Sequence, residues 1–337
     1  MTTTSPLLIR GRRPANSFVL REHKIVYISV TKVACTSLRW MLADLAGEDL
    51  ESFYKTTAAH QTRLMTIHRN RDHWQHVPQL FDVPPEEVAQ MSRDNGWFIF
   101  AVIRDPWSRL WSGWQSKFLV RHPSYVELYE KEPWFPRVPK SQDEVIEDFH
   151  TFVMARPWET NDQLAQDVHF KTQAYSVHPD RINYSKIYDL TDMSSLFADL
   201  HAHLQSIGKD KELYTPRAND TPLTLIRPAM DNGVAQAIER AYRADFKRWG
   251  DRWSLEKVKM GDAWTEDALR HLNYHVVANE RIGDMRDRAR DIKQELWETR
   301  EELARYQRLG PLFSPQRIAR AARWRLRKVR KRLQSLR

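Results

Sequence analysis

The stretch Lys24-Ile-Val-Tyr-Ile-Ser-Val-Thr-Lys-Val-Ala-Cys-Thr-Ser-Leu-Arg-Trp-Met-Leu-Ala-Asp-Leu45 decides the fold class of this chain. Residues 24–30 are rich in β-branched side chains, which is typical of a buried strand. Leucine and methionine then recur at positions 38, 41, 42 and 45, the spacing of one helical face, and Gly47 supplies a stop signal. We therefore expect a strand that turns into a helix with almost no loop between them.

A second unit of the same kind begins at Trp97. The apolar run Trp97–Ile103 predicts another buried strand, after which Asp105 suits a helix N-cap and Pro106 a first helical residue. Apolar residues at 110, 111, 114 and 118 continue at helical spacing. Two such units predict an α/β fold with a parallel sheet flanked by helices.

The 337 residues are enough for one large α/β domain or for roughly two ordinary ones. We expect a further strand at 181–188 and helices at 193–204 and 234–249, whereas residues 123–160, rich in Pro, Trp and charge, suggest a surface excursion or lid. Apolar residues from 282 to 306 keep a 3-4 spacing, which suits a coiled coil that forms a homodimer or, equally, a helix packed on its own domain. The expected parts are a disordered N-terminus (1–17), an α/β domain (18–255), a helical extension (256–310) and a basic amphipathic tail (311–337).

The formal charge of +9 lies in the tail. Residues 317–337 contain ten Lys and Arg and no acid, so residues 1–316 hold 43 basic and 44 acidic residues. Most apolar side chains of the tail share one helical face, which indicates a helix that lies on anionic lipid through residues 316–337. A solvated tail, or one that binds nucleic acid without specificity, is the alternative.

Cysteine content and the apolar runs bound the compartment. Cys35 is the single cysteine, so the chain has no internal disulfide and no cysteine-built metal site. The first residues lack the apolar core of a signal peptide, and the longest apolar run is too short to span a bilayer. We expect a cytoplasmic protein that the tail would attach to the inner face of a membrane.

Two strand-to-helix corners carry anion-binding chemistry. In the first, Lys32, Thr36 and Ser37 surround the start of a helix, where free N–H groups and the helix dipole favour a phosphate. The nucleotide-binding pattern G-x-x-x-x-G-K-[ST] is absent, because no glycine lies between Gly11 and Gly47. The alternative is a capped helix with an incidental lysine.

The second corner has Arg104 at the end of its strand and Ser112 about two turns into the helix, on one face with Ser108. An arginine fork with a hydroxyl suits one more phosphate, unless the arginine pairs with Asp105 or another acid. Two such corners on one sheet suit a ligand with phosphate groups at both ends.

These two segments carry a family resemblance. Lys32-Val-Ala-Cys-Thr-Ser37 resembles the 5′-phosphosulfate loop, and Arg104-Asp-Pro-Trp-Ser-Arg-Leu-Trp-Ser112 the 3′-phosphate motif, of carbohydrate sulfotransferases related to the HNK-1 and chondroitin 4-O-sulfotransferases. The resemblance spans roughly residues 24–250. Weaker similarities occur at His169-Phe170, Asn183–Asp189, Arg217-Ala-Asn219 and Tyr242–Phe246.

The resemblance implies a sulfotransferase fold with a P-loop-like corner that binds 3′-phosphoadenosine 5′-phosphosulfate (PAPS), a sugar or glycolipid hydroxyl as acceptor, and no metal. Lys32 would neutralise the bridging oxygen of the leaving phosphate, and the rest of the loop would bind the phosphosulfate with it. Arg104 and Ser112 would hold the 3′-phosphate. The loop residues so assigned are Lys32, Val33, Ala34, Cys35, Thr36 and Ser37.

A base for the acceptor hydroxyl is the missing part, and histidine suits it at neutral pH. His68 is the first choice, because Arg63-Leu-Met-Thr-Ile-His68 resembles the R-L-x-K-T-H segment that carries the base in cytosolic sulfotransferases, with Thr66 in place of the lysine. His60 and then His169 are the alternatives.

Two other functions stay open on the sequence. A kinase-type phosphotransferase would use the same corners, although no Walker glycines and no evident Mg²⁺-holding carboxylate lie beside the loop. A non-catalytic protein that binds membranes or polyanions would keep the fold and use the tail. Nucleic acid is disfavoured as a partner, because residues 1–316 are formally close to neutral.

Overall fold

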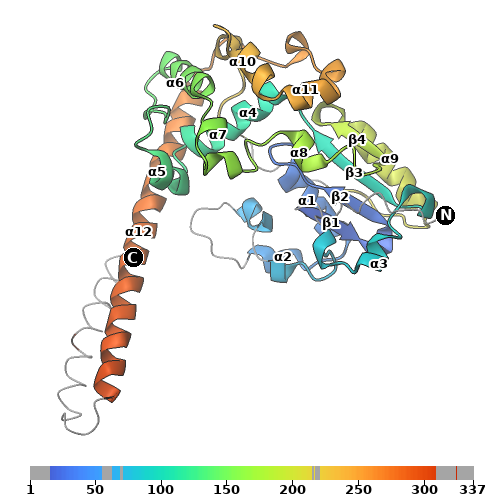
Figure 1. Cartoon of the computed structure of the whole chain (residues 1–337), viewed down its shortest axis with the longest axis horizontal. Helices are drawn as coiled ribbons and strands as arrows, with labels where there is room; N and C mark the ends of the chain where they lie inside the picture. Colours follow the sequence, from blue (N-terminus) through green and yellow to red (C-terminus); the bar gives the residue numbers. More distant parts are fainter. Residues whose placement is uncertain are drawn as a thin grey trace. The chain divides into compact units, whose positions relative to one another are not determined.

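The computed structural model describes residues 16–54, 63–68, 71–214, 216, 221–308 and 324. The chain divides into two units, Met1–Val277 and Ala278–Arg337. The first unit holds a four-stranded sheet in the order β1-β2-β3-β4, in which β1 is antiparallel to β2 and the other neighbours are parallel (Figure 1). The strands are β1 (Ser17–Leu20), β2 (Ile25–Ile28), β3 (Phe98–Ile103) and β4 (Lys186–Asp189).

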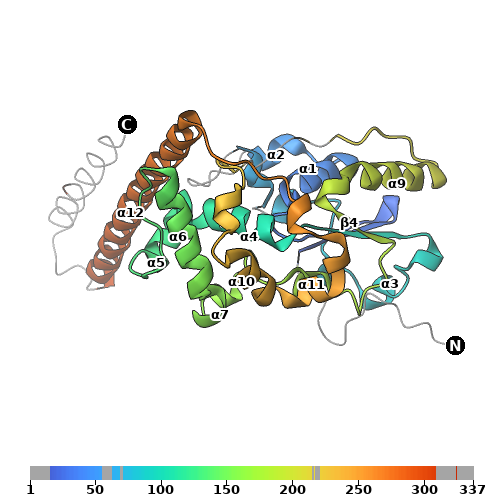
Figure 2. The same cartoon turned by 90° about the horizontal axis from the view of Figure 1, so that it is seen from above.

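Helices cover both faces of this sheet. Figure 2 shows α1 and α9 on one side and α11 on the other. The α-helices of the first unit are α1 (Cys35–Leu45), α2 (Leu50–Tyr54), α3 (Pro85–Val88), α4 (Pro106–Trp114), α5 (Pro123–Tyr129), α6 (Gln142–Ala155), α7 (Pro157–Thr160), α8 (Gln173–Val177), α9 (Met193–Ser206), α10 (Val234–Ala241) and α11 (Arg243–Trp249). A π-helical turn (Gln115–Leu119) continues α4, and a 3₁₀ helix (Arg63–His68) lies between α2 and α3 in the chain.

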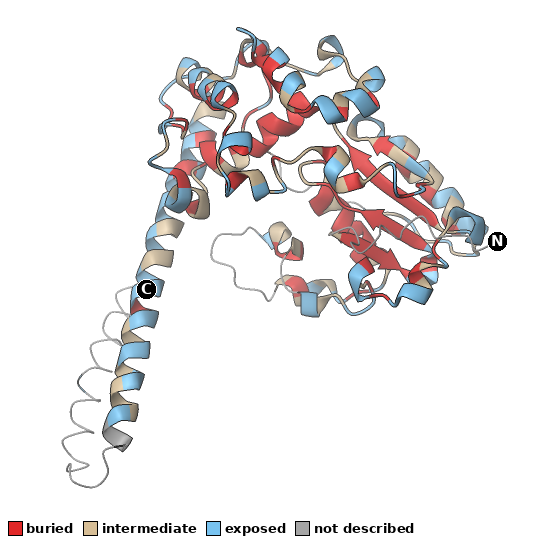
Figure 3. Ribbon diagram, in the orientation of Figure 1, coloured by how far each residue is buried: buried red, intermediate tan, exposed pale blue. Residues whose placement is uncertain are grey.

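The two strand–helix units of the sequence are confirmed. The predicted helical face of residues 38–45 is buried against the sheet, and all six residues of β3 are buried (Figure 3). Asp105 caps α4 by accepting a hydrogen bond of 2.7 Å from the Ser108 N–H, and Pro106 is the first helical residue. Because β2, β3 and β4 are parallel, their carboxyl ends lie at one edge of the sheet.

Three expectations differ from the structure. The sheet gains β1, whose four residues are too short a run to predict a strand alone. The strand expected at 181–188 is limited to Lys186–Asp189, because Arg181 and Ile182 close a turn on the His178 carbonyl. The helix expected at 234–249 is interrupted at Tyr242, whose hydroxyl donates to the Phe170 carbonyl at 2.8 Å.

The interpretation of residues 123–160 as a surface excursion is wrong. They form α5, α6 and α7, and side chains of α6 are fully buried in a second apolar cluster with α4 and α10. Full burial of one large apolar side chain stabilises a fold by roughly 1.5–3 kcal/mol. Because α6 buries several such side chains, this region is part of the core. Trp111 and Trp114 belong to the same cluster, as the helical spacing predicted.

The first compact unit continues beyond the expected boundary at 255, since the side chains of Val258, Met260 and Trp264 pack on the second cluster. Helix α12 (Glu266–Arg308) begins within the first unit and continues into the second. Among the described residues, no helix combines the length and apolar character that crossing a membrane requires. The tail at 311–337 lies outside the described residues except Trp324, and the dimer through 282–306 stays a prediction.

Candidate active site

The loop between β2 and α1 holds two non-glycine residues in the left-handed region. Lys32 has φ +68° and Ala34 has φ +58°, conformations that usually cost an L-residue about 1–2 kcal/mol each. Ala34 is the N-cap of α1 and provides no side-chain hydrogen bond to the helix start. The first N–H groups of α1 are therefore free of a side-chain cap, as in an anion-binding helix terminus.

Three other cations act on the charge of Lys32. Burial, and after it the charges of Lys117, Arg104 and Arg109, lower the pKa of Lys32 to about 7. Lys32 forms no ion pair with any described residue. A positive cluster of this kind, in which Lys32, Arg104 and Lys117 are half-buried, is stabilised by a bound anion.

The corner after β3 holds Arg104 by its backbone. The Gln173 amide accepts from the Arg104 N–H at 2.9 Å and donates to the Arg104 carbonyl at 2.7 Å. The Arg104 guanidinium forms no hydrogen bond or ion pair within the described part of the chain, and Asp105 is engaged as the cap of α4 instead. Ser112 is buried on α4, and its hydroxyl likewise has no hydrogen-bond partner among the described residues. The arrangement leaves an arginine fork and a hydroxyl for a ligand.

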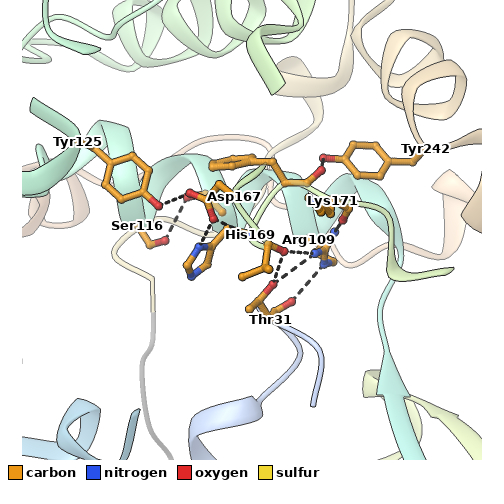
Figure 4. A network of polar contacts seen from close by, with 11 residues as sticks. Thr31, Arg109, Ser116, Tyr125, Asp167, His169, Lys171 and Tyr242 are labelled. Carbon is orange, nitrogen blue, oxygen red and sulfur yellow. Dashed lines mark hydrogen bonds and ion pairs between the residues drawn. The ribbon is translucent and has the colours of Figure 1, made fainter. Parts of the chain in front are cut away.

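Arg109, which lies within the motif Arg104–Ser112 but receives no role from it, connects the two corners. Its side chain is 1% exposed and donates to the Thr31 carbonyl at 3.1 Å, the Lys171 carbonyl at 2.8 Å and the Val168 carbonyl at 3.3 Å (Figure 4). Thr31 also donates its hydroxyl to the Val168 carbonyl at 2.9 Å. One guanidinium therefore fixes the loop before Lys32 against the segment 168–171.

Both ring nitrogens of His68 are engaged within the protein. Arg39 lies 2.7 Å from Nδ1, and the Thr36 hydroxyl lies 2.8 Å from Nε2. Because a guanidinium can only donate, Nδ1 accepts and the proton resides on Nε2, which donates to Thr36. Burial, followed by the Arg39 charge, lowers the pKa of His68 to about 2. His68 therefore holds the Thr36 hydroxyl in place.

The ring of His169 carries its proton on Nδ1, whereas that of His68 carries it on Nε2. Its Nδ1 lies 2.6 Å from Asp167 Oδ1, and its backbone N–H donates to the same oxygen at 2.9 Å. The other Asp167 oxygen accepts from the Tyr125 hydroxyl (Figure 4). Although burial raises the pKa of Asp167, the hydrogen bonds from His169 and Tyr125 hold it below its ordinary value. Asp167 is thus a carboxylate, His169 donates from Nδ1, and Nε2 carries the lone pair.

Lys117 completes the group, and no sequence motif marks it. It lies on the π-helical turn after α4, whose Gln115 amide donates to the Leu223 carbonyl at 2.9 Å and accepts from the Leu223 N–H at 3.1 Å. Burial lowers the pKa of Lys117, and the ammonium forms no ion pair with the residues that the structure describes. Isolated π-turns are frequent at functional sites.

A cavity of about 1050 Å³ opens beside the two loops. Two of its lining residues, Thr31 and Val168, directly precede Lys32 and His169 in the chain. The rest of the lining includes Tyr175, His178 and Lys247. Lys32 and His169 themselves are not among the lining residues, so the cavity adjoins the cation cluster.

Comparison with known proteins agrees with this geometry. The family described as "Sulfotransferase family" matches residues 15–250. The chain belongs to the sulfotransferase family. Carbohydrate sulfotransferase 10 of Danio rerio is 31% identical over 118 residues, which are 35% of this chain and 27% of the relative. Carbohydrate sulfotransferase 14 of the same organism is 29% identical over 111 residues, 33% of this chain and 25% of the relative.

The matched parts span about a quarter of the length of these curated relatives. No solved structure gives a significant match. The family and the α/β fold expected from the sequence are confirmed, whereas the roles of Lys32–Ser37, Arg104, Ser112 and His68 stay predictions. His60 and the segment Arg217–Asn219 lie outside the described residues.

The left-handed Ala34 of this sulfotransferase yields a stability prediction. Ala34→Gly should raise the free energy of unfolding by roughly 0.5–1 kcal/mol, because glycine adopts positive φ without strain but loses more chain entropy on folding. Urea denaturation measures the change.

Gly47→Ala is the matched reverse control. Gly47 has φ +74°, and a Cβ added to it would meet no other group within 4 Å, so any loss comes from the backbone alone. The substitution should lower the free energy of unfolding by about 1 kcal/mol. If Ala34→Gly and Gly47→Ala both lower the free energy of unfolding, the backbone at Ala34 is not strained and the prediction is wrong.

Proposed function

We propose that this sulfotransferase uses PAPS as donor and transfers the sulfuryl group to a hydroxyl of a carbohydrate or glycolipid. The observation that carries the proposal is a cluster of cations that form no ion pair with any acid the structure describes, in which Lys32 follows β2 and Arg104 follows β3. A donor with phosphate groups at two ends needs positive charge at two places, and the ends of neighbouring parallel strands can supply both. The names of the two carbohydrate sulfotransferases support the acceptor class.

The chain's own groups divide between two tasks in this proposal. Lys32 and the free N–H groups at the start of α1 stabilise the charge that develops on the leaving phosphate. Arg104 and Ser112 bind the 3′-phosphate and so fix the direction of the donor. No described group of three or more His, Cys, Asp or Glu side chains could hold a metal ion, and a metal-free reaction stays part of the proposal.

Removing either cation tests this division. Lys32→Met should lower the transfer rate constant by about 10²–10³, because a positioned charge is lost from the transition state. Arg104→Met should instead weaken binding of adenosine 3′,5′-bisphosphate by roughly 10–150-fold, the value of a lost charge-assisted hydrogen bond. Transfer of label from PAPS to a panel of glycans and calorimetry with the bisphosphate measure the two effects.

The exposed Lys131 and Arg93 provide control substitutions of the same chemistry. Lys131→Met and Arg93→Met should leave turnover and binding unchanged. Wild-type activity in both Lys32→Met and Arg104→Met would refute the proposal, and so would a folded wild-type protein that does not bind the bisphosphate. A phosphotransferase would reveal itself by transferring label from ATP and requiring Mg²⁺.

The depressed pKa of Lys32 predicts that donor binding takes up protons. A lysine with a pKa of about 7 is half-neutral at pH 7, and a bound phosphate raises its pKa toward the ordinary value. Proton uptake should therefore be largest between these two pKa values, and affinity for adenosine 3′,5′-bisphosphate should fall as the pH rises above 7. Calorimetry in buffers of different ionisation enthalpy measures the uptake, which Lys32→Met should reduce and Lys131→Met should preserve.

We also propose that the enzyme works in the cytoplasm at an anionic membrane surface, held there by residues 316–337. The support is the sequence, since ten basic residues without an acid alternate with apolar residues at helical spacing. In this proposal the tail determines location and the α/β unit determines chemistry.

Deleting residues 316–337 tests the location. The truncated enzyme should lose binding to phosphatidylserine vesicles in a sedimentation assay, and turnover of a water-soluble acceptor should stay within about twofold, as expected if the charges act only on the membrane. A variant with four tail arginines changed to glutamine should show an intermediate loss. Unchanged vesicle binding by the truncated enzyme would contradict the membrane role.

A further inference from the structure

We propose that His169, oriented by Asp167, removes the proton from the acceptor hydroxyl, and that Lys117 beside it binds the oxygens of the sulfuryl group during transfer. The inference rests on the proposed function and assigns the acceptor side of the same site. It gives His68 the role of a positioning residue.

The two ring nitrogens of His169 have different tasks. Nδ1 is committed to the Asp167 carboxylate at 2.6 Å, so Nε2, on the opposite side of the ring, is unprotonated (Figure 4). No hydrogen bond to Nε2 occurs within the described part of the chain. The Tyr125 hydroxyl and the His169 backbone N–H both bind the carboxylate and hold it in one orientation. A base oriented by a carboxylate in this way is a recurring catalytic arrangement.

His68 has no lone pair left for an acceptor proton. Its Nδ1 accepts from Arg39, and its Nε2 proton is donated to the Thr36 hydroxyl. Accepting another proton would require His68 to break the Arg39 contact inside a buried region. His169 accepts a proton at Nε2 without breaking a hydrogen bond to any residue that the structure describes.

The charges around His169 keep its ring neutral. Burial, and then the Lys117 charge, lower the pKa of His169 to about 4, while Asp167 acts in the opposite direction and Lys32 adds to the lowering. The ring is therefore neutral at pH 7 and able to accept a proton. An anionic donor bound at Lys32 and Lys117 offsets their charge, which raises the pKa of His169 and makes it a stronger base.

Lys117 is placed to act between the two halves of the site. Its ammonium lies 5.2 Å from the centre of the Tyr125 ring, and the Tyr125 hydroxyl donates to Asp167, the carboxylate that holds His169. Its charge also lowers the pKa of both Lys32 and His169. The group that passes between a leaving oxygen and an attacking oxygen carries negative charge on its outer oxygens. A half-buried ammonium without an ion pair in the described structure suits those oxygens.

The residues then act in one balanced step. His169 Nε2 takes the acceptor proton as the acceptor oxygen forms its bond to sulfur. The bond from sulfur to the bridging phosphate oxygen breaks, and its electron pair stays on that oxygen, where Lys32 stabilises the charge. His169 returns its proton to solvent after product release.

Paired glutamine substitutions test the assignment. His169→Gln should lower kcat by about 10²–10⁴, because a general base is lost, with the affinity for adenosine 3′,5′-bisphosphate preserved within about threefold. His68→Gln keeps an amide that donates to Thr36 and accepts from Arg39, and its kcat should stay within about tenfold of wild type. Lys117→Met should lower kcat by about 10²–10³. Labelled PAPS with a panel of p-nitrophenyl glycosides supplies the assay.

Asp167→Asn gives the positioning readout. An amide does not fix the Nδ1 proton, so this variant should lose kcat with little change in acceptor KM and bisphosphate affinity. Preserved kcat in His169→Gln, with bisphosphate binding intact, would overturn this inference and leave the proposed function standing. Absence of bisphosphate binding by the wild-type protein would overturn both.

A second measurement needs no acceptor. The histidine ring resonance that disappears in His169→Gln should titrate near pH 4 in the free protein, and about one to two pH units higher in Lys117→Met or with the bisphosphate bound. The His68 resonance, identified in the same way, should show no titration between about pH 5 and 8 in either state. A His169 resonance that does not respond to either change would overturn the placement of Lys117 beside the base.

Discussion

The buried guanidinium of Arg109 is the contact on which the site depends. It donates to main-chain carbonyls of two segments that are far apart in the sequence, at Thr31 and at 168–171. Its charge is permanent, so the carbonyl dipoles around it are held at every pH at which the protein is folded. Together with the hydrogen bond from the Thr31 hydroxyl to the Val168 carbonyl, this side chain fixes the position of Lys32 relative to His169. The Tyr242 and Asp245 contacts to 170–174 extend the same support toward α11.

Repulsion between like charges destabilises the site of the protein without ligand, and contacts in the surrounding structure offset this repulsion. Lys32, Arg104, Arg109 and Lys117 share one region, and the pKa of each is lowered by burial. The loop that presents Lys32 is itself held in left-handed geometry without glycine. Strain and repulsion of this kind persist where neighbouring contacts over-determine the conformation, and they favour a ligand that removes the repulsion.

The elements that depend on local periodicity were predictable from the sequence. The strand–helix units, the Asp105 cap and the core role of Trp111 and Trp114 followed from spacing and capping rules.

The prediction for residues 123–160 was wrong because their Pro- and Trp-rich composition suggested a surface segment. The sequence did carry the opposite signal, since the 3-4 spacing of a buried helix is present at Val145, Phe149, Phe152 and Val153. The pairing of β1 is set by a neighbour across a turn, which its four residues do not reveal. Lys32 and Arg104 lie in contiguous motifs, so the sequence could propose them as site residues, whereas the partner of a histidine depends on tertiary structure. His68 is held by Arg39 and Thr36, and His169 by Asp167, for which the D-x-H spacing was the available signal. Nothing in the periodicity of α4 distinguishes Arg109 from an exposed arginine.

The π-helical turn after α4 has a consequence for how this segment tolerates change in length. Ser112 lies on α4 and Lys117 on the π-helical turn that continues it, and this wide turn contains one residue more than an α-helical turn would. An α-helix rotates by about 100° per residue, so a deletion that restored regular geometry would turn everything beyond it by that angle. Homologues that shorten this segment by one residue would therefore present a different side chain at the position of Lys117.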